Sequence, residues 1–368
     1  MVTLHLIVKP NTLSTIRFKT AGTPFFDHLK SGVDSYFNAT KRNRWGNWLI
    51  IVKAIVLLTS FFALYIALVF GDLSVGMSIG ACVLLGLTLA GIGFNLMHDG
   101  AHGSFSDKKW LNEIMAHTLN MVGGDVSLWK TKHNVIHHSF TNIEGHDDDI
   151  NIQPMMRTNE NQPRYKIHRF QHIYGYILYC LTYISWVWID DVKKYRTQQV
   201  GITKLRKFTF INHFTFWATK LSYVATFVVL PMIFQGVVPA ILGYLLVSTV
   251  TGIVIAVVFQ LAHVVETTSF NNPEDTNGVI EEEWAIHQIN TTSNFATRNP
   301  LVTLFTGGLN YQVEHHLFPR ISHVHYPALN KIVRETCEKF GVQYNEYGTV
   351  FAAVRSHTRH LKTMGIAD

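Results

Sequence analysis

Short runs of histidine recur along the chain at intervals that suit one face of a helix. In the run that begins at His133, an α-helix places His137 one turn away, with His138 beside it. His98 and His102 have the same i, i+4 spacing. Neutral imidazole is a common metal ligand in proteins. These two clusters therefore predict a metal site.

A third cluster and one isolated histidine extend this pattern. Gln312, His315 and His316 stand at i, i+3 and i+4, and His263 ends a long apolar run. A single histidine is more often structural, but three clusters at ligand spacing favour a shared site. The predicted metal ligands are His98, His102, His133, His137, His138, His263, Gln312, His315 and His316.

The number and type of these ligands bear on the metal. One octahedral ion takes six ligands, so eight imidazoles and an amide indicate two ions. Nitrogen ligands suit iron, zinc, copper or nickel, and iron is preferred because it can activate oxygen, while zinc stays open. Cys82, Cys180 and Cys337 lie far apart in the sequence, which excludes a thiolate site built on short Cys spacing.

Acidic residues near the clusters are candidates to accept the second ring N–H of each ligand and so orient it. An acid exposed to solvent cannot be told from an orienting acid by sequence alone, so both roles remain open for each of these residues. The candidates are Asp99, Glu144, Asp147, Asp148, Glu266 and Glu314.

Long apolar segments must position these clusters. The chain is 48% hydrophobic and 15% charged, against roughly 25% charged in ordinary soluble proteins. Four segments are long enough to cross a bilayer, at 48–70, 75–97, about 214–234 and about 240–262. The segment 173–189 is shorter and rich in aromatic residues, which favours an interfacial helix. We expect an all-α integral membrane protein with four transmembrane helices in two hairpins and a cytosolic helical cap that holds a di-metal site.

The clusters divide the chain into alternating membrane and polar parts. We expect a cytosolic N-terminal arm, a first hairpin, a cytosolic segment with two clusters, a second hairpin and a cytosolic C-terminal segment. Their ranges are 1–47, 48–97, 98–212, 213–263 and 264–368.

Positive charge predicts the orientation. No Lys or Arg occurs between Lys53 and Lys108 or between Lys220 and Arg298, so both short turns between spans lack positive charge. The positive-inside rule then places both termini and every histidine cluster on the cytoplasmic side of a multi-pass protein. Lys53 and Lys220 lie within spans and are expected to snorkel to the headgroups. The net charge of +6 suits anionic lipid or a phosphate-bearing substrate, and no motif supports nucleic-acid binding.

The clusters HDGAH (98–102), HNVIHH (133–138) and QVEHH (312–316) resemble the three histidine boxes of membrane fatty-acid desaturases. Gln at the start of the third box, within 307–329, is similar to the front-end subgroup. The resemblance implies a cytosol-facing di-iron centre held by the boxes and by His263. It also implies an oxidoreductase that uses O2 to insert a cis double bond into a long acyl chain, carried as acyl-CoA or acyl-lipid.

Two further expectations depend on this resemblance. Many front-end enzymes carry a fused b-type cytochrome with an HPGG motif, which this sequence lacks. The electron donor is then expected to be separate, such as a ferredoxin or a b-type cytochrome with its reductase. Candidate residues for the acyl tunnel are Trp129, Trp284, Thr291, Thr292 and Asn294, although core packing is the more common role for such residues.

Three other functions remain as alternatives. A di-iron hydroxylase or epoxygenase would share the ligands and differ in its product. A zinc-dependent membrane hydrolase would need fewer ligands and no electron donor. A histidine-rich transporter would be expected to carry ionisable groups inside its spans. The four predicted spans contain no Asp or Glu, and Asp72 lies in the turn between the first two. This composition disfavours a transporter.

Overall fold

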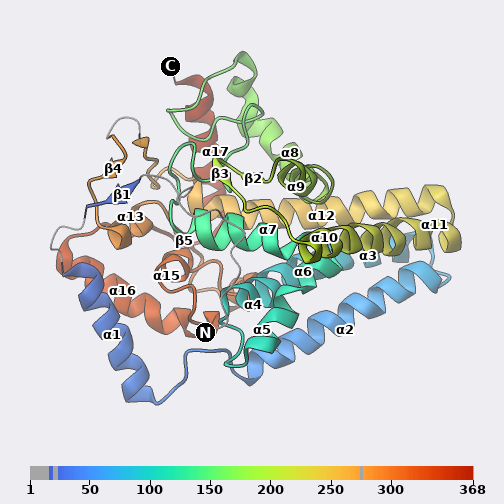
Figure 1. Ribbon diagram of the computed structural model, residues 1–368, viewed down its shortest axis with the longest axis horizontal. Helices are drawn as coiled ribbons and strands as arrows, with labels where there is room; N and C mark the ends of the chain where they lie inside the picture. Colours follow the sequence, from blue (N-terminus) through green and yellow to red (C-terminus); the bar gives the residue numbers. More distant parts are fainter. Residues whose placement is uncertain (1–15, 20–23, 274–276, 368) are drawn as a thin grey trace.

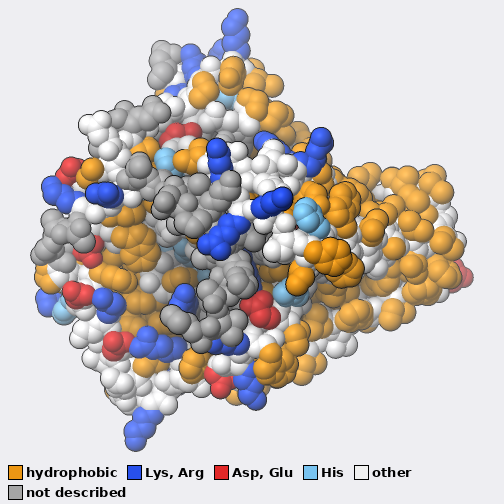
Figure 2. Space-filling model, in the orientation of Figure 1, with side chains coloured by type: hydrophobic (Ala, Val, Ile, Leu, Met, Phe, Trp, Pro, Cys, Tyr) orange, Lys and Arg blue, Asp and Glu red, His pale blue; other side chains and the backbone are white. Residues whose placement is uncertain are grey.

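The protein consists of a bundle of long helices that projects from one side of a broad helical cap (Figure 1). The computed structural model describes residues 16–19, 24–273 and 277–367. On the face seen in Figure 2, hydrophobic side chains cover the projecting end, whereas Lys and Arg lie on the cap. This division matches a membrane part joined to an aqueous part.

Four helices in the described part of the chain are long and apolar enough to cross a membrane, which confirms the predicted fold class. They cover Trp48–Phe70, Val75–His102, Phe210–Gln235 and Val237–His263. The second span extends through His98 to His102, so it carries the first histidine cluster as its own last turn. The third begins four residues earlier than expected.

In detail, two of these spans are built from several helical segments. The span elements are α2 (Trp48–Phe70), α3 (Val75–Ile92), η1 (Gly93–Met97), α4 (His98–His102), α10 (Phe210–Val224), η5 (Ala225–Val229), α11 (Leu230–Gln235) and α12 (Val237–His263).

Polar residues fix the ends of the first hairpin. The Asn47 side chain accepts a hydrogen bond from the backbone N–H of Leu49 at the start of α2, and Ser74 accepts one from Met77 at the start of α3. Such caps satisfy N–H groups that have no partner inside the helix. Both helices of the hairpin therefore begin where the sequence indicates.

The spans α3 and α12 pack closely at Gly86. A Cβ atom at this position would lie 2.8 Å from the Val250 side chain and 2.9 Å from the carbonyl oxygen of Val247. Only glycine permits this approach of the two helices. The contact holds together the two spans that end at His98 and His263.

Two lysines within the spans do not behave as expected. Lys220 is 7% exposed, and its ammonium group donates to the Asp191 carboxylate at 2.9 Å and to the carbonyl of Gly123 at 2.6 Å. The prediction that Lys220 snorkels is therefore wrong, because its charge is neutralised inside the protein. Lys53 Nζ lies 3.0 Å from Nε2 of His323, so it also points into the protein.

Shorter helices form the cap. They are α1 (Phe25–Thr40), α5 (Lys109–Ala116), α6 (Thr118–Met121), α7 (Val126–Lys130), η2 (Thr131–His137), η3 (Lys166–Phe170), α8 (Gln171–Ser185), η4 (Trp186–Asp190), α9 (Asp191–Thr197), α13 (Trp284–Asn290), α14 (Pro300–Thr306), α15 (Gln312–Leu317), η7 (His323–His325), α16 (Tyr326–Phe340) and α17 (Val350–Ile366). Helix α8 covers most of the predicted interfacial segment and is not among the four candidate spans.

Among the described residues there are three two-residue ladders, and two of them connect distant parts of the cap. β1 (Arg17–Phe18) pairs in parallel with β4 (Val279–Ile280), and β5 (Asn294–Phe295) pairs in parallel with β6 (Glu346–Tyr347). β2 (Gln199–Val200) and β3 (Thr203–Lys204) form an antiparallel hairpin. The first ladder ties part of the N-terminal arm to the C-terminal segment.

Candidate metal centre

Four separate elements bring the predicted ligands to one place. α4 carries the first histidine cluster at the end of a span, and α12 ends at His263. η2 and the residue after it carry the second cluster, while α15 carries the third. Because two of these elements end membrane helices, the site lies where the bundle joins the cap.

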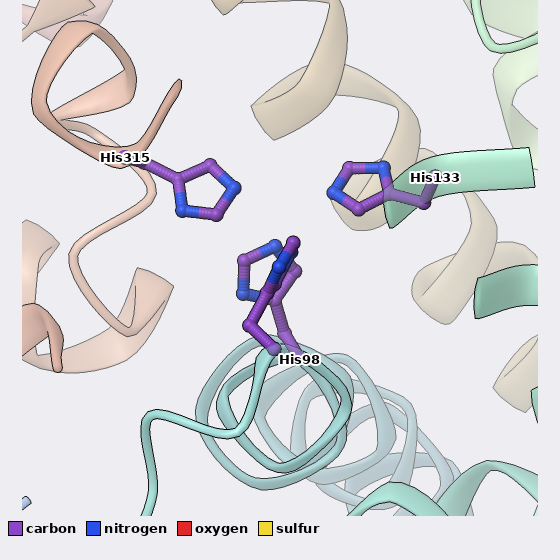
Figure 3. Close-up of side chains that lie close together, drawn as sticks. His98, His133 and His315 are labelled. Atoms are coloured by element: carbon purple, nitrogen blue, oxygen red, sulfur yellow. The ribbon is translucent and has the colours of Figure 1, made fainter. Parts of the chain in front are cut away.

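Four imidazoles form the first group. One ring nitrogen from each of His98, His102, His133 and His315 lies within 4.8 Å of the others. Figure 3 shows the rings of His98, His133 and His315 directed toward one another from three different elements. The ring centroids of His98 and His315 are 4.5 Å apart, although these residues are far apart in the sequence.

A second group lies beside the first. It comprises His137, His263 and His316, whose ligand atoms also lie within 4.8 Å of one another. His138 stands between the groups, because its ring centroid is 4.8 Å from that of His102 and 4.4 Å from that of His316. Two adjacent groups are the arrangement that two ions require.

A π-helical turn directs the second cluster toward both groups. The segment η2 is a π-helix, and the backbone N–H of His138 donates to the carbonyl of His133 at 3.1 Å. In an α-helix, His138 would point about 140° away from His133. The i→i+5 bond of a π-turn instead places residue i+5 close above residue i. This turn lets His133, His137 and His138 all face the site.

Two carboxylates orient histidines of the second cluster. Oδ2 of Asp147 accepts from Nδ1 of His137 at 2.9 Å, and Oδ2 of Asp149 lies 3.0 Å from Nδ1 of His133. Asp149 also groups geometrically with His133 and His137. Its hydrogen bond to the outward nitrogen makes it an orienting acceptor. Each bond leaves Nε2 of its histidine free for a metal.

Neutral groups orient the third cluster. Oε1 of Gln288 accepts from Nδ1 of His316 at 2.8 Å, and the Tyr326 hydroxyl lies 3.1 Å from Nδ1 of His315. The carbonyl of Thr291 lies 3.4 Å from Nδ1 of His263. The outward nitrogens thus have partners, which fixes the direction in which Nε2 of each ring points.

The inward nitrogens have no such partners. Nε2 of all eight predicted histidine ligands is buried without a hydrogen-bond partner among the described residues. For His138, Nδ1 is unpartnered as well, and Oε1 of Gln312 is also buried and unpaired. Buried polar atoms normally find partners. So many inward-facing lone pairs fit the requirements of metal ions that accept nitrogen ligands.

Burial keeps most of these rings neutral, as ligation requires. It lowers the pKa of His133 to about 3, despite the hydrogen bond to Asp149. Burial also lowers the pKa of His138, His315 and His316 well below the ordinary value. For His137, burial is the largest single influence and acts in the same direction, but the charge and the hydrogen bond of Asp147, together with the charge of Asp149, raise its pKa above the ordinary value.

Most of the acids proposed as orienting groups have other partners. Oδ1 of Asp99 lies 4.0 Å from Nδ1 of His98, at the limit of an ionic contact, while its Oδ2 accepts from Nδ1 of His323 at 2.8 Å. Asp147 performs the predicted role, and Asp149, which was not proposed, performs it for His133.

The four other acids do not contact ligand histidines through any hydrogen bond found in the described structure. Glu144 accepts from Asn159 and Gln162, and Asp148 pairs with Lys194. The Glu314 carboxylate accepts from Asn294, Asn330 and the Tyr344 hydroxyl. The backbone of Glu266 bonds to Ser356. The sequence placed these acids close to the clusters but did not indicate their direction.

Sequence reasoning missed Gln288, Tyr326 and His323, which contact ligands or their acceptors. Tyr326 and His323 follow the third cluster closely, and this proximity is the one signal that could have indicated them. Two histidines outside the predicted ligand set contact backbone carbonyls: Nε2 of His287 lies 2.9 Å from the carbonyl of Thr141, and Nδ1 of His146 lies 3.2 Å from the carbonyl of Glu144.

The proposed tunnel residues have different surroundings. The Trp129 ring stacks on His133 with centroids 4.5 Å apart, and Trp284 Nε1 lies 3.4 Å from the carbonyl of His138. These two therefore adjoin the metal centre. Thr292 donates to the carbonyl of Gln288, within its own turn. Thr291 and Asn294 are also fully buried and hydrogen-bonded.

Comparison with known proteins gives a consistent result. Residues 74–348 match the model of a family described as fatty acid desaturase. This range includes every predicted ligand and both membrane hairpins except α2.

Individual relatives agree over almost the whole chain. The acyl-lipid (8-3)-desaturase of Physcomitrium patens is 36% identical over 350 residues, which cover 94% of this chain and 72% of the relative. The sn-1 linoleoyl-lipid 6-desaturase of Synechocystis sp. is 35% identical over 341 residues, or 92% of this chain and 95% of the relative. The acyl-lipid (8-3)-desaturase of Mortierella alpina is 30% identical over 357 residues, or 94% and 78% respectively.

Proposed function

This chain belongs to the fatty acid desaturase family, and we propose that it is a membrane di-iron acyl-lipid desaturase of the front-end type. It is a membrane protein of an oxidoreductase family that acts on acyl chains. The proposal adds the metal, the co-substrate O2, the acyl carrier and the position of the new double bond within the chain.

The observation that carries the proposal is the pair of adjacent imidazole groups with free, buried Nε2 atoms. Breaking a methylene C–H bond is beyond the acid–base chemistry of side chains, and two iron ions held here would supply the oxygen-dependent chemistry. The protein's own part is to hold the ligands. Asp147, Asp149 and Gln288 fix the rings of His137, His133 and His316.

The ligand count supports this function over a zinc hydrolase. Catalytic zinc takes three protein ligands and leaves one position open. Here His98, His102, His133 and His315 already form one complete group, and a second group lies beside it. His138 lies between the two groups, and Gln312, whose buried Oε1 has no partner among the described residues, shares α15 with His315 and His316. We therefore propose all nine predicted residues as ligands.

The substrate and orientation follow from the relatives and from charge. The relatives' printed names refer to acyl-lipid substrates and to 6- and (8-3)-desaturation. We propose an acyl chain of a membrane lipid for this protein too, with Trp129 and Trp284 beside it. The absence of Lys and Arg from the turns at 71–74 and 236–239 supports a cytoplasmic metal centre and cytoplasmic termini. A separate ferredoxin or b-type cytochrome would supply electrons.

Expression in a host that lacks polyunsaturated lipids tests the function. Cells fed defined acyl chains are expected to accumulate a product with one additional cis double bond, identified by mass spectrometry. The variants His137→Ala and His315→Ala should form no detectable product and retain fewer metal ions, because each removes a buried ligand. His117→Ala is a matched control, since its side chain is about half exposed. A hydroxylated or epoxidised product would assign the protein to the related di-iron reaction instead.

A further inference from the structure

Five exposed cationic residues gather at one side of the cap. They lie on α9, on the β2–β3 hairpin and on the segment that follows it, and the sequence from 192 to 265 contains no Asp or Glu. We name this surface the hairpin patch, and its members are Lys193, Arg196, Lys204, Arg206 and Lys207. The carboxylate of Asp148 lies beside Gly201 of the hairpin and is paired with Lys194. A surface with a net positive charge attracts an acidic partner over a distance and speeds association.

The hairpin patch sits on the back of the element that carries the second histidine cluster. Beneath it, Val200, Leu205 and Phe208 pack against Leu128 of α7 and Ile136 of η2. Figure 1 shows β2 and β3 beside α7 and α9. Ile136 points to the patch, whereas His133 and His137 on either side of it in the sequence point to the metal centre. One helix therefore separates the patch from the ligands.

Ion pairs link the patch to a ligand. Lys194, on the same helix as Lys193, pairs with Asp148 at 3.1 Å. The next residue, Asp149, accepts from Lys132 at 2.6 Å and from Nδ1 of His133 at 3.0 Å. These pairs hold α9 in a fixed position relative to His133. The patch is thus rigidly placed near the metal centre.

We infer that the hairpin patch is the docking surface for an acidic electron-transfer protein, an inference that rests on the proposed function. Forming one double bond removes two hydrogen atoms from the acyl chain and reduces one O2 to two waters. The balance requires two more electrons and two protons. A one-electron donor must therefore bind and leave twice in each turnover, and charged contacts favour such rapid, transient encounters.

The position of the patch favours a redox partner over lipid headgroups. Electron transfer slows steeply with distance, so a donor gains from a surface one helix away from the ligands. Headgroup binding would be served by cations anywhere around the membrane boundary. That boundary is marked by exposed apolar residues at the start of α10, where Phe210 is 82% exposed and Ile211 is 72% exposed. Lys207 lies three residues before Phe210, so the experiment must separate lipid from donor.

Reversal of charge tests the inference. The triple variant Lys193→Glu, Arg196→Glu, Lys207→Glu is compared with a control triple variant of equal charge change on α16 and α17, namely Lys331→Glu, Arg359→Glu, Lys362→Glu. All six residues are exposed. The full-length, metal-loaded protein in zwitterionic nanodiscs is assayed with a plant-type [2Fe–2S] ferredoxin. Binding of oxidised ferredoxin is measured directly at several salt concentrations, and turnover is measured with reduced ferredoxin.

The patch variant should bind ferredoxin roughly tenfold more weakly or worse and lose most of the salt dependence. Its apparent KM for ferredoxin should rise while kcat at saturating ferredoxin changes less than about twofold, as expected for a lost surface charge. The control variant should match the wild type. Equal binding by patch and control variants would overturn the inference. An effect seen only when anionic lipid is added would assign the patch to headgroups instead. Failure of the wild type to desaturate with any donor would refute the proposed function, not the docking surface.

Discussion

Five of the proposed ligand histidines bond to the protein through Nδ1 and keep Nε2 without a partner, namely His133, His137, His263, His315 and His316. For His133 and His137 the outward nitrogen meets a carboxylate, whereas for His315 and His316 it meets a hydroxyl or an amide oxygen. A carboxylate raises the basicity of the imidazole more than a neutral acceptor does. The two imidazoles of η2 are therefore expected to be the stronger donors.

Asp147 provides a direct test of this difference. Its Oδ2 accepts from His137 and from the backbone N–H of Asn142, and its Oδ1 accepts from the backbone of Asp149. Asp147→Asn keeps the shape but removes the charge and one acceptor. The metal affinity should fall roughly 10- to 100-fold. Competition with a chelator measures this change, and excess iron should restore activity.

Asp148→Asn is the matched control for Asp147→Asn. Asp148 pairs with Lys194 on the outside of the same loop and has no bond to a ligand histidine in the described structure. Its metal affinity should equal that of the wild type. If the two variants lose metal equally, the loop as a whole and not the carboxylate–histidine bond sets the affinity.

Two of the four ligand-bearing elements contain or follow a π-helical turn. η1 comes directly before His98, and η2 contains His133 and His137. A π-turn adds one residue to a helical turn and shifts the face of everything after it. Because of η2, three histidines in six positions share one face, which an α-helix does not allow.

Insertion of one alanine after Val135 tests the spacing of the histidines in η2. Val135 lies between the histidines and is partly buried. The insertion makes His137 and His138 the fifth and sixth residues after His133, and one added residue rotates both by about 100° relative to His133. We expect metal content to fall by more than half, with the helical circular dichroism unchanged. Val135→Ala should retain the metal, and full metal content in the insertion variant would show that the spacing is dispensable.

The sequence predicted the spans and the convergence of the histidine clusters better than the contacts that orient the histidines. Long apolar runs and the spacing of histidines can be read directly from the sequence. The four spans, and the position of His263 at the end of a span near the other clusters, could therefore be predicted. The π-turn was not, because it is stabilised by tertiary contacts and not by local propensity. Asp149, Gln288 and His323 were missed because side-chain direction depends on the folded loop. The inward-facing Lys220 was missed for the same reason, since its partner Asp191 comes from another element.

On the face seen in Figure 2, Lys and Arg lie on the cap, and apolar side chains cover the projecting bundle. The turns at the far end of the bundle, 71–74 and 236–239, contain no Lys or Arg, whereas the histidine clusters of α4 and α12 lie at the opposite end of the spans. This arrangement gives the membrane protein one basic face, beside which the proposed metal centre lies. The orientation of that face across the bilayer is the property to test.

Labelling of single cysteines tests the orientation. In a background with Cys82, Cys180 and Cys337 replaced by serine, Asp72→Cys should react with a membrane-impermeant maleimide added outside intact cells, because it lies exposed in the far turn. Lys362→Cys, exposed on α17, should react only after the cells are opened. The reverse pattern would place the metal centre outside the cytoplasm.

The close crossing of α3 and α12 at Gly86 indicates that substitutions far from the histidines can also inactivate the protein. His98 and His263 lie toward the cap ends of the two spans that meet there, and they belong to different imidazole groups. A methyl group at position 86, about 18 Å along the helix from His98, would push the spans apart and change the distance between the two imidazole groups. Inactivating lesions are thus to be sought in the lipid-embedded crossing as well as among the ligands, and such lesions would leave every donor atom intact.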